Sequence, residues 1–475
     1  MFKNALISGN FNVLHPGHIR LFKFAKENCK RLTVAVHSDS LGGKAAYIPE
    51  NLRLEGVSSN NFVDYSFILR EPINEYISRE KPDIVVKGRE HESKKNTEEL
   101  ALKEYGGKLI FASGDFIFAM PNNNLHLPSK DILKIPSDYV KRHNINTKHL
   151  ENIVEKFSTL KVLVIGDLII DEYISCKVLG LSQEEPTLVV SPSESKRFIG
   201  GAGIVSAHAS SLGANVSLIS VVGSDKVGEF AHKNLKKFGV ENQFFVDPSR
   251  PTTLKKRYRV ENRSMLKVSE VHQDSVSVDI QDDIYNHILR VIDSYDMLVF
   301  SDFNYGCLPK DLVRKISELA IKKKKFVSAD SQSSSQVGDV SKFQNIDLIT
   351  PTEREARISL KNHEDGLVVL SQRLKEKTKV KYVLLKLGRE GVMIQERITD
   401  KLMSTDQIPA LNINPIDVSG AGDSMLISSS MALVIGANIW EAGLIGSVSA
   451  ALQISQIGNN PLNLSDILQV LGENS

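Results

Sequence analysis

The stretch "ALISGNFNVLHPGHIRLFKFAKENC" (residues 5–29) decides the fold of the N-terminal part of the chain. Its first residues form a short apolar run typical of a buried strand, and from residue 19 the apolar residues recur at helical spacing. Where a strand turns into a helix, free backbone N–H groups and the positive end of the helix dipole face the carboxyl edge of the sheet. The stretch therefore predicts an α/β sheet with an anion site at this turn.

Two histidines, His15 and His18, lie three residues apart in this turn. At that spacing they share one face of the first helical turn, and their N–H groups could donate to phosphate oxygens as charge builds. Gly9 and Gly17 allow a ligand to approach the backbone closely. The alternative is a histidine that caps the turn and a second one on the surface, but two histidines around a glycine favour the phosphate site.

Strands and helical patterns alternate from there on. Apolar runs at residues 5–8, 32–39, 83–88 and 108–113 are separated by helical patterns such as 18–29 and 94–105, which indicates a parallel sheet. A stretch rich in Asn, Pro and Ser follows at residues 119–144. We therefore expect a first domain over residues 1–140, a linker helix over 141–158 and a second domain over 159–475.

The second domain repeats the alternation on a larger scale. Buried strands are predicted at residues 161–173, 216–225, 297–303, 326–331, 347–352 and 382–388. Two further runs, at 187–195 and 255–271, alternate between apolar and polar residues. Alternation of this kind is typical of a half-exposed sheet, so we expect a small β lid on a larger α/β body.

Composition excludes several classes of protein. Among 475 residues, 59 basic and 57 acidic side chains nearly cancel to a formal charge of +2, which gives no electrostatic reason to expect a nucleic acid or membrane partner. The three cysteines, Cys29, Cys176 and Cys307, are far apart in the sequence, as expected in a reducing cytoplasm without structural zinc. No apolar run is long enough to span a membrane, and we expect a cytoplasmic protein.

A second chemical motif, "DVSGAGDSM", covers residues 417–425 and opens a helix of small and apolar residues. A Gly-Ala-Gly turn exposes consecutive backbone N–H groups that can hold a phosphoryl group. A carboxylate beside such a turn, Asp423, suits a base that accepts the proton of an attacking hydroxyl. The alternative is an acidic residue that only stabilises the start of the helix.

The N-terminal motif "GNFNVLHPGH" resembles the G-x-F-D-x-x-H-x-G-H signature of the cytidylyltransferase-like nucleotidyltransferases, with Asn12 in place of the Asp. The resemblance implies transfer of a nucleotidyl group from an NTP to a phosphate, with His15 and His18 as catalytic residues. The segment "KPDIVVKGRE" is similar to a later motif of that family, although Arg89 and Glu90 depart from it. The implied nucleotide-binding residues are Gly9, Phe11, Gly17, Lys44, Arg53, Lys87, Gly88 and Ser129.

Residues 160–470 resemble the ribokinase-like sugar kinases, through "GDLIIDEYI", "FIGGAGIVSAHASSLGA", "PTTLKKRYRV" and "DVSGAGDSM". Within that family they most resemble the heptose-7-phosphate kinase half of the enzymes of ADP-heptose synthesis, whose other half is an H-x-G-H nucleotidyltransferase and usually comes second. The resemblance implies Asp423 as base, Gly420, Ala421 and Gly422 as anion hole, Lys386 and Gly388 on the nucleotide side, and Glu355 at magnesium. The implied sugar-side residues are Asp167, Asp171, Gly200, Gly201, Lys255, Arg257 and Lys267.

Two substitutions depart from the kinase pattern. Ile204 replaces an asparagine that contacts the sugar, and Tyr305 replaces a lysine that could face a phosphorylated sugar. Because a site built for a hydrogen bond discriminates strongly, we expect these residues to change the substrate.

The sequence thus predicts a Rossmann-like nucleotidyltransferase domain followed by a ribokinase-like domain, an enzyme that makes a nucleotide-activated sugar. Its expected ligands are Mg²⁺, ATP, a second NTP and a sugar phosphate, and a homodimer is compatible with the sequence. Two alternatives stay open: a sugar kinase with a degenerate N-terminal domain, and a module that binds nucleotide and sugar without turnover.

Overall fold

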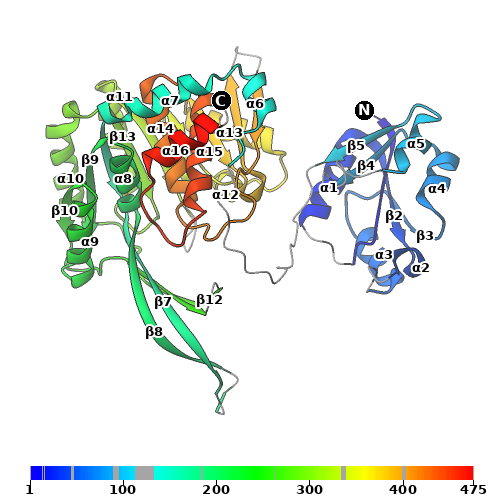
Figure 1. The fold of residues 1–475 in the computed structure, drawn as a ribbon, viewed down its shortest axis with the longest axis horizontal. Coiled ribbons are helices and arrows are strands. Elements are labelled where there is room, and N and C mark those ends of the chain that lie inside the picture. Colours follow the sequence, from blue (N-terminus) through cyan, green and yellow to red (C-terminus); the bar gives the residue numbers. More distant parts are fainter. Residues whose placement is uncertain are drawn as a thin grey trace. The chain divides into compact units, whose positions relative to one another are not determined.

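The computed structural model describes residues 2–12, 14, 16–43, 46, 48–88, 96–112, 133–182, 184–185, 187–260, 263–332, 338–397 and 403–473. The chain divides into two compact units, Met1–Leu127 and Pro128–Ser475 (Figure 1). Of the residues named above, His15, Lys44, Arg89, Glu90 and Ser129 lie outside the described residues.

The first unit is built on a five-stranded sheet with the order β3-β2-β1-β4-β5, in which all neighbours run parallel. Its strands are β1 (Phe2–Gly9), β2 (Cys29–His37), β3 (Tyr65–Leu69), β4 (Ile84–Gly88) and β5 (Lys108–Ala112). Its helices are α1 (Pro16–Asn28), α2 (Asp39–Gly42), α3 (Glu50–Ser58), α4 (Ile73–Glu80) and α5 (Glu98–Lys103).

Alternate residues of β1 serve the two faces of this sheet. Ala5 and Ile7 pack against α1 and α3 in one apolar cluster, whereas Leu6 joins a second cluster with residues of α4 and α5. The order of the strands reverses between β1 and β4, and ligands of open α/β sheets bind at the carboxyl ends of the strands at such a point. Helix α1, whose first turn contains His18, follows β1 and begins at this edge.

The second unit contains a nine-stranded sheet with the order β10-β9-β6-β13-β14-β15-β16-β17-β18, antiparallel only from β16 onward. These strands are β6 (Lys161–Gly166), β9 (Asn215–Val222), β10 (Glu241–Val246), β13 (Met297–Asp302), β14 (Phe326–Ser331), β15 (Leu348–Ile349), β16 (Tyr382–Lys386), β17 (Val392–Arg397) and β18 (Met403–Ile408).

Helices cover both faces of the nine-stranded sheet. In β6, Val162 and Val164 face one cluster and Leu163 and Ile165 face the other, as the two-residue period of a strand requires. The first layer contains α7 (Thr147–Glu155), α8 (Ala202–Ser211), α9 (Lys226–Lys237), α14 (Ala421–Ile435), α15 (Ile439–Gln453) and α16 (Leu464–Glu473). The second contains α10 (Val278–Val291), α11 (Lys310–Lys322), α12 (Glu353–Leu360) and α13 (Leu367–Thr378).

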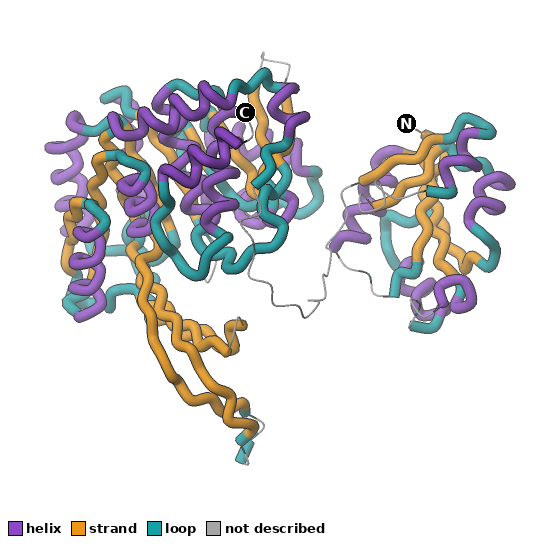
Figure 2. Tube along the Cα trace, in the orientation of Figure 1, coloured by secondary structure: helices purple, strands orange, loops and turns teal. Residues whose placement is uncertain are grey.

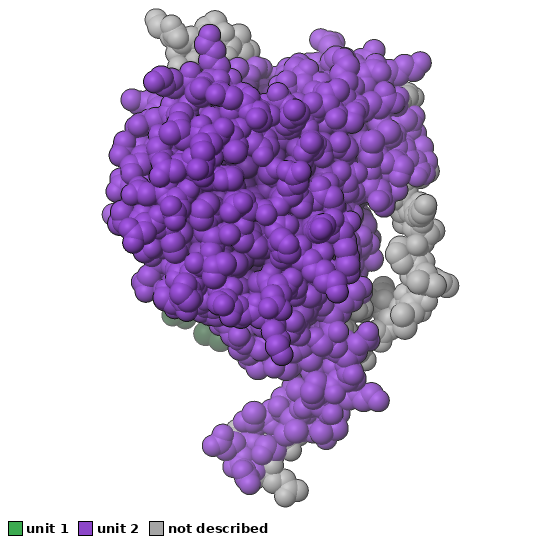
Figure 3. Space-filling view, turned by 90° about the vertical axis from the view of Figure 1, so that its left-hand side faces the viewer, with its two compact units in different colours: residues 1–127 green, residues 128–475 purple. Residues whose placement is uncertain are grey.

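Four strands leave this body as a separate sheet with the order β12-β11-β7-β8 (Figure 2). They are β7 (Leu168–Leu181), β8 (Leu188–Gly201), β11 (Leu254–Val260) and β12 (Arg263–Glu270). In the space-filling view they form a narrow arm below the compact body of the second unit (Figure 3). The lid expected from the alternating sequence patterns is therefore present.

The linker expected over residues 141–158 is different in the structure. A helix does form there, α7, but Leu150, Ile153 and Val154 are buried in the core of the second unit. The preceding helix α6 (Ser137–Arg142) joins the same unit, since the hydroxyl of Tyr139 donates to the carbonyl of Trp440 at 2.9 Å. A helix with an apolar face is stable only when that face is buried. Because both helices bury their apolar faces in the second unit, this unit begins before residue 141.

None of the helices in the described part of the chain is long and apolar enough to cross a membrane.

Candidate functional sites

The turn after β1 is shaped by Phe11. Its backbone has a positive φ of 50°, an unusual conformation for a bulky residue, and its ring folds back over Gly9. The ring of His18, in the first turn of α1, packs edge-on against Phe11 with 5.2 Å between centroids. Backbone strain of this kind is found at ligand sites, and here it places His18 and the start of α1, including Gly17, at the carboxyl end of β1.

Polar side chains gather at the same edge of the sheet. Lys87, near the end of β4, pairs with the buried Glu98 at 2.7 Å, and the amide oxygen of Asn10 lies 3.2 Å from Nδ1 of His37. Burial, and then the charge of Arg53, lower the pKa of His37. Of the predicted residues, Lys87 and Gly88 thus lie at the switch point, and Asn10, His37 and Glu98 join them there.

Arg53, which the sequence predicts as a nucleotide contact, lies between the loops after β1 and β2. Its guanidinium is fully buried and donates to the carbonyls of Ile48, Asn10 and His37 and to the carboxylate of Asp39, at 2.6 to 2.8 Å. Four of its five N–H donors are engaged in this way. Arg53 is therefore a structural residue that ties together the loops after β1 and β2.

The second candidate site lies where α14 begins. Gly420 precedes the helix with a φ of 79°, and a side chain here would also meet Oδ1 of Asn459, 2.7 Å from the Cβ position. Ala421, Gly422 and Asp423 form the first turn of the helix, so its free N–H groups and the Asp423 carboxylate lie side by side. Asp423 is 5% exposed.

A buried ion pair adjoins this turn. The ammonium group of Lys386, at the end of β16, donates to Oδ2 of Asp330 in β14 at 2.6 Å. The same nitrogen lies 2.9 Å from the position that a Cβ on Gly422 would occupy, so it sits against the start of α14. Lys386 therefore brings positive charge to the predicted anion hole.

Burial governs the protonation of these groups. It raises the pKa of Asp423 to about 7, helped by repulsion from Asp330 and opposed by Lys386. Burial also raises the pKa of Asp330 to about 6. For Lys386, burial opposes the charge, but the carboxylates of Asp330 and Glu355 outweigh it and raise the pKa. The site thus holds a protonated lysine and a carboxylate that titrates near neutrality, as a general base should.

Asp171, which the sequence predicts as a sugar contact, lies in β7. Its Oδ1 accepts from Arg257 of β11 at 3.1 Å, and its Oδ2 accepts from the amide of Asn459 at 3.3 Å. A side chain on Gly200 would lie 2.7 Å from that Oδ2, which explains the glycine at the end of β8. Asp171 is also close enough to raise the pKa of Asp423, so the two predicted residues share one site.

Lys255 lies on β11 beside this cluster. Its ammonium group is 5.0 Å from the centre of the Tyr305 ring and 5.5 Å from that of Phe303, in cation–π contact with both. Tyr305 itself is buried, and so is Ile204 in α8. Tyr305, which replaces the lysine of the kinase pattern, therefore contacts the ammonium group of a different lysine, Lys255.

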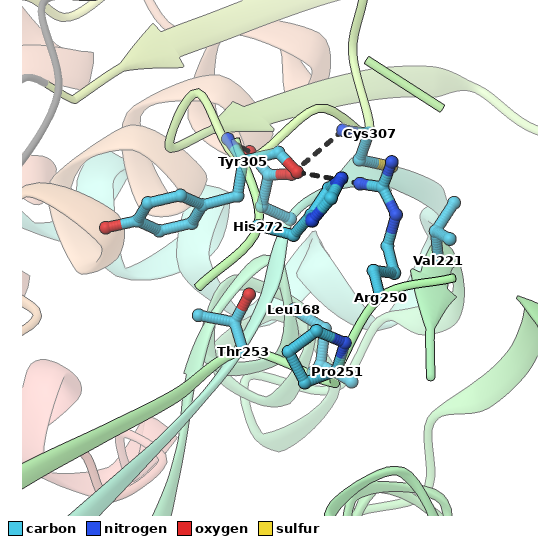
Figure 4. A pocket seen from close by; sticks show the side chains of 9 residues that line it. Leu168, Val221, Arg250, Pro251, Thr253, His272, Tyr305 and Cys307 are labelled. Atoms are coloured by element: carbon cyan, nitrogen blue, oxygen red, sulfur yellow. Dashed lines mark hydrogen bonds between the residues drawn. The ribbon is translucent and has the colours of Figure 1, made fainter. Parts of the chain in front are cut away.

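Asp167 has a structural role that the sequence did not predict. Its two carboxylate oxygens accept the backbone N–H groups of Phe303, Tyr305 and Cys307 at 2.8 to 3.2 Å. These bonds shape the loop after β13 and leave Asp167 in the wall of a small pocket with Thr253 (Figure 4). Asp167 thus positions the loop that carries Tyr305, whereas Asp171 lies near Asp423.

The structure also places three other predicted residues. Lys267 is opposite Arg257 in the β11–β12 ladder, and its side chain is exposed. Gly388 begins the short helix η6 (Gly388–Glu390), with open space around its Cβ position. Gly201 has a φ of 58° and ends β8 directly before α8, where a side chain would meet the carbonyl of Asp167.

Glu355, the predicted magnesium residue, belongs to a capping box at the start of α12. Its Oε2 accepts the N–H of Thr352 at 2.7 Å, and the Thr352 hydroxyl accepts the N–H of Glu355. The carboxylate is buried and acts electrostatically on both Asp330 and Lys386. In the described part of the chain, no three His, Cys, Asp or Glu residues are grouped so that they alone could hold a metal.

Sequence reasoning missed three members of the site: Asp330, Gln332 and Asn459. The amide of Gln332 donates to Oδ1 of Asp423 at 3.2 Å. Asp330 and Gln332 stand at the end of the strand predicted over 326–331, and polar residues at the carboxyl end of a parallel strand were an available signal. Asn459 lies in an Asn-rich loop that carried no such signal.

Family models match both parts of the chain. Residues 6–110 match the cytidylyltransferase-like family, and residues 159–465 match the pfkB family carbohydrate kinases. The expected fold class, a Rossmann-like unit followed by a ribokinase-like unit with a β lid, is thereby confirmed.

The chain is also similar in sequence to several curated proteins of one name. The chain is 31% identical over 315 residues to "Bifunctional protein HldE" of Helicobacter hepaticus and 30% identical over 312 residues to the protein of that name from Campylobacter fetus. These matches cover 66% and 65% of this chain, and 64% and 66% of the relatives' own length.

Among solved structures, ribokinase of Arabidopsis thaliana, solved with ribose and ATP, is 18% identical with a TM-score of 0.51. Phosphofructokinase-2 of Escherichia coli is 17% identical with a TM-score of 0.53. Each match covers 66% of this chain and 98% of the solved chain, and each shows a shared fold. By its sequence from residue 159 to 465, and by the fold that this part adopts, the chain belongs to the pfkB family of carbohydrate kinases.

Proposed function

We propose that the chain is a two-activity enzyme that makes a nucleotide-activated sugar. Its second unit phosphorylates a sugar phosphate with ATP, and its first unit joins the resulting sugar 1-phosphate to the nucleotidyl group of an NTP. The observation that carries the proposal is the Asp423 carboxylate, buried beside the free N–H groups of α14 and facing Lys386. A site that only bound phosphate would gain nothing from that negative charge.

In the kinase reaction, Asp423 accepts the proton of the acceptor hydroxyl as its oxygen attacks the γ-phosphorus of ATP. The bond from the γ-phosphorus to the bridging oxygen breaks, and ADP leaves. The N–H groups of Gly420, Ala421 and Gly422 and the ammonium group of Lys386 stabilise the charge on the transferred phosphoryl group. The proton on Asp423 then returns to solvent.

A magnesium ion fits the residues present. Mg²⁺ prefers hard oxygen ligands and is usually held by one or two carboxylates together with substrate phosphates. The buried Glu355, near Lys386 and Asp330, would hold it on the nucleotide side. When bound, the ion would neutralise charge on the phosphate oxygens.

In the transferase reaction, a phosphate oxygen of the sugar 1-phosphate attacks the α-phosphorus of the NTP and pyrophosphate leaves. The nucleophile is already an anion, so the protein positions the reactants and needs no base. His15 and His18 stabilise the charge that develops on the phosphate oxygens. Lys87, at the carboxyl end of β4, would contact the nucleotide.

The acceptor belongs to the heptose-like sugar phosphates. The resemblance of residues 160–470 to the heptose-7-phosphate kinases and the cation Lys255 beside Tyr305 support a phosphorylated acceptor. Ile204 and Tyr305 remove polar contacts expected for heptose 7-phosphate, so the preferred sugar differs from it in at least one hydroxyl. Because ATP is the donor and the three cysteines are unbridged, we expect the reaction to take place in the cytoplasm.

The test supplies ATP and other NTPs with heptose 7-phosphate, hexose 6-phosphates and the corresponding sugar 1-phosphates, and measures ADP and pyrophosphate separately. Release of both products supports two activities. Release of ADP alone supports a kinase with a degenerate first unit, and binding without either product supports a non-catalytic module.

The lid further supports a homodimer. Among the strands that the structure describes, the outer strand β12 pairs with β11 alone. Apolar side chains are exposed on the lid strands, namely Val178, Leu179, Leu188, Val189, Met265, Leu266 and Val268. A second copy of the same sheet would cover this surface. Leu266→Lys should shift a dimer to monomer in light scattering, whereas Val278→Lys, on exposed α10, should not.

A further inference from the structure

Gln332 links the end of β14 to the carboxylate of Asp423. Its Nε2 donates to Oδ1 of Asp423 at 3.2 Å. Gln332 directly follows β14, whereas Asp423 lies in α14, and 91 positions separate them in the sequence. No motif marks this glutamine, and the chemistry described above does not use it.

The backbone of Gln332 is held on both sides. Its N–H donates to the carbonyl of Asp302 at 2.8 Å, and its carbonyl accepts the side-chain amide of Asn304 at 3.0 Å. Asn304 has a positive φ of 60°, which fixes the loop after β13 in an unusual conformation. The ends of β13 and β14 therefore present the Gln332 side chain to Asp423 in a defined orientation.

Asp423 is surrounded by charged groups from four strands: Asp330 of β14, Lys386 of β16, Asp171 of β7 and Lys255 of β11. Lys386 donates to Asp330, and Lys255 lies over aromatic rings. Among the described residues, Gln332 is the one whose side chain donates a hydrogen bond to Asp423.

We infer that Gln332 is a positioning residue for the phosphoryl transfer: its amide holds Oδ1 of Asp423, so that Oδ2 is aimed at the acceptor hydroxyl. This inference rests on the proposed kinase activity. A neutral amide suits the role, because it orients the carboxylate while a cation at the same place would remove most of its basicity.

The experiment compares Gln332→Met, Gln332→Lys and Gln332→Glu in the full chain. The matched control is Gln344→Met, since Gln344 is also half-buried but donates to the carbonyl of Ser341 away from the site. The probes are ATP with heptose 7-phosphate and hexose 6-phosphates, and ADP release is recorded between pH 5 and 9. If the wild type releases no ADP from any acceptor, the kinase proposal fails, which is a separate result.

Gln332→Met should lower kcat about tenfold to a hundredfold with little change in KM, because a misaligned base slows the chemical step. The acid limb of the pH profile should move down by about one unit in Gln332→Lys and up by about one unit in Gln332→Glu. Opposite shifts show that the side chain at position 332 faces the base, and the loss of kcat at nearly unchanged KM in Gln332→Met, absent from Gln344→Met, shows that the amide positions it. The inference is overturned if both charged variants shift the limb in the same direction or leave it in place, or if Gln332→Met behaves as Gln344→Met does.

Discussion

The ammonium group of Lys386 and the carboxylate of Asp330 form a buried ion pair, with Nζ 2.6 Å from Oδ2, against the first turn of α14. The two residues come from β16 and β14, which the short strand β15 separates in the sheet. Both charged groups are buried. If one of them is removed, the other is left in a low-dielectric environment without its counter-ion.

Lys386→Met should therefore lower both the stability of the protein and its rate of ADP release. It leaves Asp330 buried without a counter-ion, which should lower the free energy of unfolding by about 3–5 kcal/mol. It also removes a cation from the anion hole, which should lower kcat for ADP release by about a hundredfold. Chemical denaturation and steady-state kinetics measure the two effects.

The double variant Lys386→Met/Asp330→Asn separates these effects. Removing both charges should restore most of the stability but none of the rate. Recovery of kcat in the double variant would show that Lys386 acts only by neutralising Asp330.

Asp423→Asn should abolish ADP release and leave pyrophosphate release from a supplied sugar 1-phosphate unchanged. The amide cannot accept the proton of the hydroxyl, and the transferase reaction does not use this residue. Both products are measured on the same preparation. Loss of both activities would contradict separate sites.

The buried base should also make activity and stability depend on pH in opposite directions. With the pKa of Asp423 at about 7, kcat/KM for the acceptor should fall as the pH drops through 7, because the protonated form is no base. In the unfolded chain, the carboxyl group of Asp423 has its ordinary pKa of 3.8. Between pH 4 and 7 the folded state therefore binds more protons than the unfolded state, and the free energy of unfolding falls as the pH rises.

The same linkage predicts that Asp423→Asn is more stable than the wild type at pH 8, by up to about 4 kcal/mol, since three pKa units correspond to that energy. The difference should shrink toward pH 4. Thermal unfolding at pH 8 and pH 5 measures it. An equal difference at both pH values would contradict a raised pKa.

In the first unit, His18→Ala and Arg53→Ala should behave differently. His18→Ala removes a donor at the phosphate site and should lower the rate of pyrophosphate release about a hundredfold in a folded unit. Arg53→Ala leaves the carbonyls of Asn10, His37 and Ile48 without their donor, and should lower the unfolding free energy by about 3 kcal/mol.

Pyrophosphate release and limited proteolysis distinguish the two variants. His18→Ala should resist proteolysis as the wild type does, whereas Arg53→Ala should be cut within residues 1–127. If Arg53→Ala keeps its resistance and loses only activity, Arg53 has the nucleotide contact first expected of it.

Much of this architecture follows from local patterns. The short apolar runs become β1, β2, β4 and β5 of the first sheet and most of the inner strands of the nine-stranded sheet, and the alternating runs become part of the lid. The two-residue period of a strand shows whether one or both of its faces are buried. The patterns missed β3, β10, β17 and β18, which lie at or near the edges of their sheets. Edge strands are partly exposed, and their sequences are correspondingly less apolar.

The sequence by itself singled out the two glycine-containing turns and the carboxylates of Asp423 and Asp171 as candidates, since each candidate needs only a local backbone conformation and a side chain of the right chemistry. Only the tertiary structure decided which charges meet. It turned Arg53 and Asp167 inward as supports, joined Lys386 to Asp330, and brought Gln332 and Asn459 to the site. Contacts between residues from different strands depend on how the sheet orders its strands, and local periodicity carries no information about that order.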